Sequence, residues 1–216
     1  MTVRVRYSSI EYPDFDIHVR ALWDTQQFAD DEGHALAAGV SSAAWPLFGM
    51  LWPSGRVLAR IMASRDCKDL RILEVGCGLG LSSLVLNHRG ADITATDHNP
   101  AVWAFLDVNT TLNGDPRIPF VRTDWQDTES TLDRFDLIVG ADVLYERHLI
   151  DDLAEFLRRR CADGGQVVIV DPGRKPRNRF CRKMEALGFQ YDHRAAVADE
   201  RCDDAPVAHV LTFVLP

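Results

Sequence analysis

The sequence predicts a doubly wound α/β fold, in which a mostly parallel seven-stranded sheet lies between two layers of helices. Three observations predict it. Strand-like and helix-like segments alternate through five units from about residue 70 onward. A glycine-rich turn, Gly76–Gly80, follows the first of these strands, and two strand-like runs with no helix between them close the chain. Alternation is typical of a parallel sheet covered on both faces, and the final pair predicts one antiparallel strand near the C-terminal edge.

The predicted strands are short apolar or alternating runs, most of them bounded by turn signals: Arg71–Val75, Ala91–Thr96, Ile118–Val121, Phe135–Gly140, Gln166–Val170, Phe189–Val197 and Val207–Leu215. A polar loop around Asp199–Ala205 predicts that the last two pair in antiparallel fashion.

The predicted helices are Leu81–His88, Asn99 to about Leu112, a segment over residues 149–160, and Arg177–Leu187. Asn99 and Pro100 are suited to the N-cap and the first helical position. The third helix has two aspartates in its first turn and three arginines in its last, which complements the helix dipole at both ends.

Length, composition and charge limit the classes of function. The chain has 216 residues, 46% hydrophobic and 26% charged, which is typical of a globular protein. We expect an N-terminal extension over residues 1–50 that packs near the ligand edge of the sheet, followed by a domain over residues 51–216. A net charge of −8 disfavours general binding to nucleic acid and to anionic membranes.

The remaining compositional signals concern location. No apolar stretch reaches the roughly 18 residues of a membrane span, and the N-terminus has no apolar signal core. Five irregularly spaced cysteines fit reduced thiols in the cytoplasm better than a disulfide framework. The histidines and cysteines form no recognisable metal-binding pattern, so no metal is expected.

The glycine-rich loop indicates the ligand. Gly76, Gly78 and Gly80 allow the backbone to pass close to a ligand and to turn sharply into a helix. The absence of a lysine after them excludes a P-loop. Glu74 is awkward beside a pyrophosphate but suits a ligand with an ammonium and a sulfonium, and Asp97 can accept both ribose hydroxyls. This set favours S-adenosylmethionine over NAD; the alternative is a simple tight turn with Asp97 as a helix cap.

Two further residues follow the third strand. Trp125 is suited to lie against an adenine ring, and Asp124 to accept its amino group. The alternative for Trp125 is a loop tryptophan buried as packing.

Four stretches carry a resemblance to a known family: Trp52–Ala59, Ile72–Leu81, Asp142–Tyr145 and Asp171–Arg174. Over about residues 45–216 the chain resembles the class I, Rossmann-like methyltransferases that depend on S-adenosylmethionine. Within them it is most similar to the protein-lysine methyltransferases that include the enzyme acting on the electron-transfer flavoprotein β-subunit.

The resemblance implies a cofactor site for S-adenosylmethionine, with S-adenosylhomocysteine as the product. The implied contacts are Trp52, Glu74, Gly76, Gly78, Asp97, His98, Asn99, Trp125 and Ala141. Cys77 and Gly80 complete the loop, and Asp124 accompanies Trp125. Cys77 is expected to be a packing residue, since no base lies near it in sequence.

The resemblance also implies that Asp142 and Tyr145 face the acceptor nitrogen as the catalytic pair. A helical turn after the fourth strand would place them on one face, with Asp142 holding an ammonium. Trp45 and Phe48 are expected to exclude water, and Asp171 and Arg174 to bind substrate. The structural alternatives are a helix N-cap for Asp142, a core aromatic for Tyr145, and a plain Pro-Gly turn at 171–174. The basic run from Arg174 to Lys183 is expected to be a solvated helix face rather than a grip on an acidic partner.

Three functions stay open at this point. The favoured one is a protein-lysine methyltransferase. The second is a methyltransferase for a small amine or hydroxyl metabolite, and the third is a non-catalytic module that binds NAD or another nucleotide cofactor. The partner is therefore a protein or a small-molecule acceptor. The oligomeric state is open, with a monomer favoured.

Overall fold

A computed structural model describes residues 3–197 and 207–216 and contains the predicted sheet. Its strand order is β5-β4-β3-β6-β7-β9-β8, and β9 runs antiparallel to both of its neighbours while the other pairs are parallel. The strands are β3 (Arg71–Val75), β4 (Asp92–Asp97), β5 (Phe120–Arg122), β6 (Phe135–Ala141), β7 (Cys161–Asp171), β8 (Gln190–Val197) and β9 (Val207–Val214). The predicted fold class is confirmed, including the antiparallel final pair.

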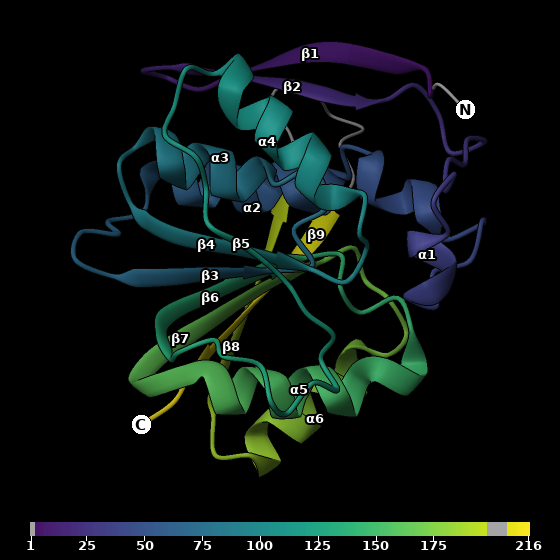
Figure 1. The fold of residues 1–216 in the computed structure, drawn as a ribbon. Helices are drawn as coiled ribbons and strands as arrows, with labels where there is room; N and C mark the ends of the chain where they lie inside the picture. Colours follow the sequence, from purple (N-terminus) through teal and green to yellow (C-terminus); the bar gives the residue numbers. More distant parts are fainter. Residues whose placement is uncertain (1–2, 198–206) are drawn as a thin grey trace.

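Helices cover both faces of this sheet (Figure 1). One layer consists of α2 (Pro53–Ser64), α3 (Leu81–His88) and α4 (Val102–Leu112), and the other of α5 (Ile150–Arg160) and α6 (Arg177–Ala186). Each layer has its own apolar core. Successive strand side chains point to opposite faces, so Ile72 joins the first core and Leu73 the second.

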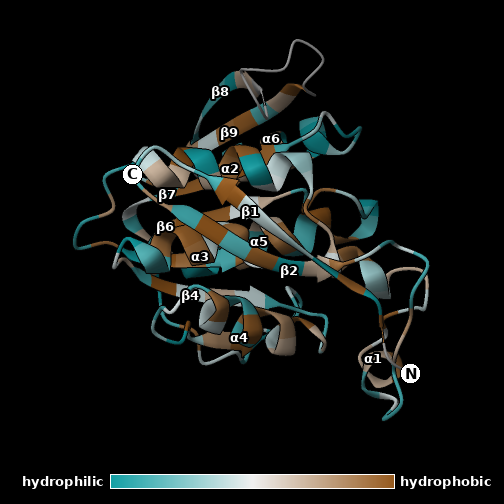
Figure 2. Ribbon diagram, turned by 90° about the horizontal axis from the view of Figure 1, so that it is seen from above, coloured by the Kyte–Doolittle hydropathy of each residue, from teal (hydrophilic) through white to brown (hydrophobic). Residues whose placement is uncertain are grey.

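An N-terminal hairpin, which the sequence reading lacked, lies across the outer side of the first helix layer (Figures 1 and 2). It consists of β1 (Val5–Glu11) and β2 (Asp16–Leu22). Pro13 and Asp14, a turn signal between two alternating runs, are the feature that could have predicted it.

Two asparagines, Asn109 within α4 and Asn113 at its C-cap, bind the free edge of β2. The side chain of Asn113 accepts the N–H of His18 and donates to its carbonyl, both at 2.8 Å. The side chain of Asn109 does the same at Arg20, at 2.7 and 3.3 Å. Residues four apart on a helix and two apart on a strand have matching spacing, so the two amides continue the β ladder.

From the hairpin the chain crosses to the carboxyl edge of the large sheet. The segment contains α1 (His34–Ala37) and the short helix η1 (Trp45–Gly49), and it leads into α2 after Trp52. A second short helix, η2 (Arg147–Leu149), precedes α5. The expected division into an extension over 1–50 and a domain over 51–216 stays a prediction.

Three predicted boundaries are wrong for identifiable reasons. The third strand begins at Phe120 instead of Ile118, because Pro119 has no N–H for the ladder. The fifth begins at Cys161 instead of Gln166: Gly164 and Gly165 form a register shift inside the strand rather than a break before it.

The third wrong boundary concerns α4, which begins at Val102 rather than just after Asn99, although Asn99 Oδ1 accepts the N–H of Ala101 at 3.0 Å. The other three predicted helices lie within a few residues of their predicted ranges. The loop predicted around Asp199–Ala205 falls outside the described residues.

Among residues 3–197 and 207–216, no helix has the length and apolarity needed to cross a membrane. No group of three or more potential metal ligands of the His, Cys, Asp or Glu type occurs in that part of the chain.

Candidate functional site

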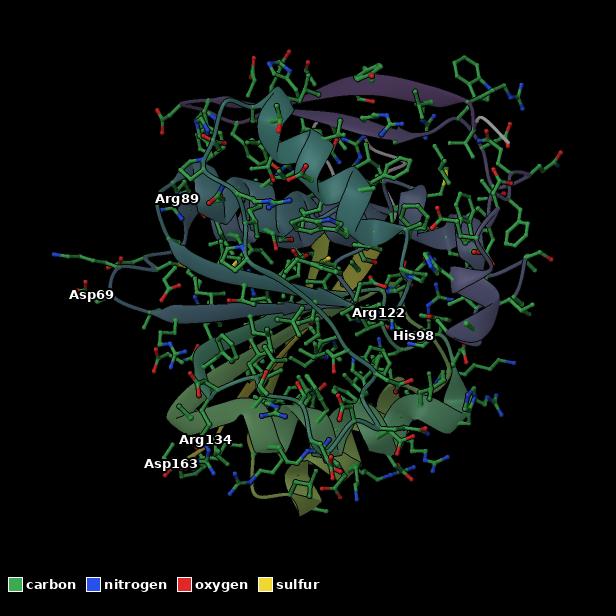
Figure 3. The ribbon with its side chains drawn as sticks, viewed as in Figure 1. Asp69, Arg89, His98, Arg122, Arg134 and Asp163 are labelled. Carbon is green, nitrogen blue, oxygen red and sulfur yellow. The ribbon has the colours of Figure 1, made fainter. Side chains whose placement is uncertain are left out.

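A cavity of about 790 Å³ opens at the carboxyl ends of β3, β4 and β6. This is the switch point of the sheet, where β3 has β4 on one side and β6 on the other, and it is the usual ligand position in doubly wound sheets. Figure 3 shows His98 and Arg122 at this edge, and Asp69, Arg134 and Asp163 at the opposite one. The predicted site residues that line the cavity are Phe48, Trp52, Glu74, Gly76, Cys77, Gly78, Asp97, His98, Asn99, Asp124, Trp125, Ala141, Asp142, Tyr145 and Arg174.

The backbone of the loop after β3 favours glycine at two of the positions that line the cavity. Gly76 and Gly78 have φ values of 59° and 53°, in the left-handed region. A Cβ on Gly76 would stand 2.9 Å from Cγ1 of Val143, and one on Gly78 would stand 2.9 Å from the carbonyl oxygen of Phe48. The loop is therefore packed against the segment that follows β6 on one side and against η1 on the other.

Glu74 is a buried carboxylate at the floor of the cavity. Its Oε2 accepts the backbone N–H of Ser83 at 2.9 Å and the hydroxyl hydrogen of the same residue. It thereby caps the first turn of α3. Burial raises the pKa of Glu74 to about 7, although the hydrogen bonds from Ser83 oppose the shift.

Asp97 organises the loop from the end of β4. Its Oδ2 accepts the N–H of Gly78 at 2.9 Å, and its Oδ1 accepts the N–H of Asn99 at 2.8 Å. Asn99 in turn donates to the carbonyl of Trp45 at 3.0 Å, which ties the N-terminal segment to this loop. Burial raises the pKa of Asp97 as well.

These two acids make the cavity suited to a cation. Each is destabilised as an anion by burial, and a positive ligand charge nearby would relieve that cost. The glycine cradle and the acceptor oxygens of Asp97 fit a ribose-bearing, positively charged cofactor such as S-adenosylmethionine. They fit a pyrophosphate less well, because both carboxylates would repel it.

The adenine side of the predicted site is held by α5. Asp124 pairs with His98 at 3.5 Å, and both lie at the cavity. The carbonyl of Trp125 accepts a hydrogen bond from Arg159 at 3.1 Å. Arg160 donates to the carbonyls of Ser130 and Leu132. The arginines that complement the helix dipole thus also hold the loop that carries Trp125, a role that sequence reasoning missed.

The side of the cavity where β6 and β7 end contains an ion pair. Oδ1 of Asp142 accepts hydrogen bonds from Nε of Arg174, at 2.7 Å, and from its Nη2. Asp142 has a φ of 60°, and its own N–H donates to the carbonyl of Val170 at 2.9 Å. The two residues are 32 positions apart in sequence, and no local pattern relates them.

Tyr145 stands at the mouth with 48% of its surface exposed. Its pKa is raised to about 12, first by burial of the hydroxyl and then by the charges of Glu146 and Asp97. The phenol is therefore protonated at neutral pH. The helical turn expected between Asp142 and Tyr145 is wrong: that stretch is irregular and η2 begins only at Arg147, yet both side chains still reach the cavity.

Three predicted site residues do not line the cavity. Trp45 is buried against Phe48, with ring centroids 5.3 Å apart. Gly80 is the N-cap of α3, where a Cβ would meet Leu106 at 2.5 Å. Asp171 is fully buried, and its Oδ1 accepts the N–H groups of Gly173 and Arg174 at 2.8 and 2.7 Å. Each supports a residue that does line the cavity.

The basic run after β7 is not a uniformly solvated face. Arg174 turns to the cavity, whereas Arg179 and Lys183 pair with Asp151 and Glu155 of α5. The opposite charges on α5 are the sequence signal that could have predicted this pairing.

Comparisons with known proteins identify the family of the chain. The sequence pattern of a family described as lysine methyltransferase matches residues 36–186, more than half of the chain. The chain is 32% identical over 134 residues to a Danio rerio protein named electron transfer flavoprotein beta subunit lysine methyltransferase, covering 60% of this chain and 51% of that one. It is 30% identical over 129 residues to the protein N-lysine methyltransferase METTL21A of Mus musculus, covering 56% of this chain and 59% of that one.

The fold has solved counterparts. The structure of a precorrin-6y C5,15-methyltransferase from Geobacter metallireducens superposes with a TM-score of 0.60 at 14% identity, over 74% of this chain and 87% of that one. At this identity the likeness shows the fold alone. The chain spans about half the length of the Danio rerio relative, so the extra length of that protein has no counterpart in the match.

Proposed function

Since the chain belongs to the lysine methyltransferase family, we propose that it transfers a methyl group from S-adenosylmethionine to the side-chain nitrogen of a lysine in a protein. The observation that carries the proposal is one cavity that holds a buried carboxylate, Glu74, and a partly buried one, Asp97, beside a glycine cradle and, on its other side, an aspartate and a tyrosine. The relatives' names include the same reaction class at moderate identity.

The cofactor is S-adenosylmethionine, and it supplies a methyl group bonded to a positively charged sulfur. Gly76 and Gly78 leave room for its methionine part, and Glu74 and Asp97 offset its positive charge. Asp97 is suited to bind the ribose, with His98 and Asn99 beside it, while Trp125 and Asp124 are suited to the adenine. Ala141 and Trp52 complete the walls, and Cys77 packs within the loop.

The chain's part in the reaction is to position the acceptor amine and to exclude water from the cavity. Methyl transfer needs a neutral amine whose lone pair points along the line of the bond that breaks. Asp142 and Tyr145 lie where they can orient that amine, and Phe48 provides apolar wall. Tyr145 acts as a hydrogen-bonding and aromatic wall rather than as a base, because its hydroxyl keeps its proton at neutral pH.

The proposal also includes a cellular location, a division into domains and a class of partner. The four cysteines that the structure describes are unpaired and buried, which supports a reducing, cytoplasmic location. A division between an N-terminal extension and the catalytic domain is supported by Phe48 and its neighbours, which reach the cavity from outside the strand–helix alternation. Protein rather than nucleic acid is the proposed partner, in line with the net charge of −8.

The test uses isotopically labelled S-adenosylmethionine. The purified protein is incubated with it and with heat-inactivated lysate of the source cells, and labelled proteins are separated and hydrolysed to amino acids. We expect label in methylated lysine, and mass spectrometry of the labelled band identifies the acceptor. Label confined to small molecules, or released by mild base as expected of an ester, would contradict the proposal. Calorimetry with S-adenosylhomocysteine and with NAD tests the cofactor separately.

A further inference from the structure

The acceptor side of the cavity already contains a positive charge where a lysine ammonium is expected. Arg174 contacts Asp142 through two nitrogens, and both contacts are to Oδ1. The Asp142 side chain is only 9% exposed and that of Arg174 36%, so the pair is partly shielded from water. A charge so close to the acceptor position bears on the chemistry of the acceptor.

We propose that Arg174 is a positioning residue that offsets the negative charge of Asp142, so that Asp142 orients the acceptor amine without trapping it in its protonated form. The inference rests on the proposed function and deepens it, because it states which protonation state the site selects.

Both partners are fixed by the backbone before any substrate arrives. The turn after β7 holds Arg174 because its N–H and that of Gly173 both donate to Oδ1 of the buried Asp171. Asp142 is held in the left-handed region with its N–H on the carbonyl of Val170. The ion pair is therefore built into the junction of β6 and β7. With Oδ1 occupied by Arg174, Oδ2 is the oxygen left to accept a hydrogen bond from the acceptor nitrogen.

The charges around Asp142 show why its negative charge needs to be offset. Each element that lines the cavity beside Asp142 contributes titratable groups, whereas the lining residues of the N-terminal segment and α2 are uncharged. The groups that line the cavity or lie beneath the Arg174 turn are Glu74, Asp97, His98, Asp124, Tyr145, Glu146, His148 and Asp171. The acids outnumber the cation, and a carboxylate within about 4–6 Å stabilises the charged form of an amine by one to three pKa units.

A lysine that entered an uncompensated site would therefore keep its proton. Its nitrogen would have no lone pair to give, and methyl transfer would stop. With Arg174 beside Asp142, the lysine releases a proton to solvent at the open mouth. The nitrogen lone pair then forms the N–C bond while the S–C bond breaks and its electrons stay on sulfur. The methylated ammonium that results can lose its proton to water.

The test is the pH dependence of kcat for three full-length variants, with the purified acceptor from the labelling experiment at saturating concentration. We expect Arg174→Gln to move the rising limb of the kcat profile to higher pH by about one unit, so kcat at pH 7 falls roughly tenfold. KM for the acceptor should stay unchanged or fall, because a bare carboxylate binds the ammonium well. Arg174→Lys keeps the charge and should restore the wild-type profile.

Arg179→Gln is the matched control. It removes the same group from the same stretch of chain, but its partner is Asp151 on the outer side of α5 and α6. The wild-type profile is expected. Since a merely structural role for Arg174 would lower kcat at every pH without moving the midpoint, an unmoved midpoint in Arg174→Gln overturns the inference.

A second measurement does not depend on the acceptor. In the ¹⁵N-edited NMR spectrum, the Nε–H of Arg174 should exchange slowly with solvent in the wild type and rapidly in Asp142→Asn. Equal exchange in both proteins would mean that the ion pair is absent in solution, and would overturn the inference. If the wild type methylates no lysine at any pH, the proposed function itself fails and the inference fails with it. Activity with an unmoved midpoint removes the inference alone.

Discussion

Gly78 lies against the backbone of Phe48, such that a Cβ on the glycine would stand 2.9 Å from the Phe48 carbonyl oxygen. A backbone oxygen cannot move aside as a flexible side chain can. We therefore expect Gly78→Ala to lower the affinity for S-adenosylhomocysteine at least tenfold and to destabilise the fold. Gly90→Ala is the control, since Gly90 has a comparable φ of 74° but open space around it.

The Gly90→Ala control separates the effect of backbone strain from the effect of the contact with Phe48. Strain at a left-handed position costs about 1–2 kcal/mol in either variant. Only Gly78→Ala should lose cofactor affinity, which calorimetry measures, with urea denaturation giving the stability. Equal affinity in the two variants would mean that the contact between the cofactor loop and η1 has no bearing on binding.

Asp97→Asn tests the cofactor loop from β4. The amide keeps one acceptor, but its NH₂ group must face a backbone N–H of either Gly78 or Asn99. Loss of a charge-assisted bond of about 1.5–3 kcal/mol should weaken cofactor binding tenfold to a hundredfold. Asp92→Asn at the exposed start of the same strand should bind normally. Normal binding by Asp97→Asn would remove this residue from the cofactor site.

Asp142→Asn tests the acceptor side. Asparagine tolerates the left-handed φ of 60° at this position, so the backbone should be preserved. Turnover should fall on the order of a hundredfold if orientation of the acceptor is what the site supplies, with cofactor affinity unchanged. Asp151→Asn removes another aspartate paired with an arginine and should be active. A joint loss of turnover and cofactor affinity in Asp142→Asn would assign Asp142 to the cofactor side instead.

Glu74 makes stability depend on pH. Burial raises the pKa of Glu74 from 4.5 to about 7, so between these values the folded protein holds a proton that the unfolded chain has lost. Its contribution to the free energy of unfolding is therefore greatest below about pH 4.5. It declines as pH rises to 7, by a total of about 3 kcal/mol, and levels off above that.

Glu74→Gln should remove this decline, because an amide does not titrate. Urea denaturation of both proteins at pH 5, 6, 7 and 8 measures the difference between their free energies of unfolding. Because Asp97 and Asp171 are present in both proteins, this difference reports the titration of Glu74 alone. The variant should gain stability relative to the wild type as pH increases. Parallel curves would show that Glu74 is not buried as an acid.

Local patterns predicted much of this molecule, and contacts between distant segments account for what they missed. The run Arg71–Val75 is apolar and ends in glycines, so its strand and the ligand loop follow from neighbours in sequence. The strand at Phe120 was misplaced by only two residues, because the missing N–H of Pro119 outweighs the buried Ile118 beside it.

The site was predicted unevenly for the same reason. Residues at strand ends, such as Glu74 and Asp97, reach the cavity because parallel strands present their carboxyl ends at one edge. The direction of Trp45, inward to the core, depends on Phe28 and Phe48 around it. The pairing of Asp142 with Arg174 depends on β6 and β7 lying side by side, and no local pattern in the sequence predicts it.

The asparagine ladder between α4 and β2 has a consequence for the order in which the chain folds as it is made. His18 and Asn113 are 95 residues apart, and Arg20 and Asn109 are 89 apart. Ribosomes add about 5–20 residues per second, so β2 exists for roughly 5–20 seconds before the amides that complete its edge. During that interval β1 and β2 can pair with each other, but the outer backbone groups of β2 face solvent or other nascent chains. The hairpin thus completes its contacts only after α4 and the residue that follows it have been made.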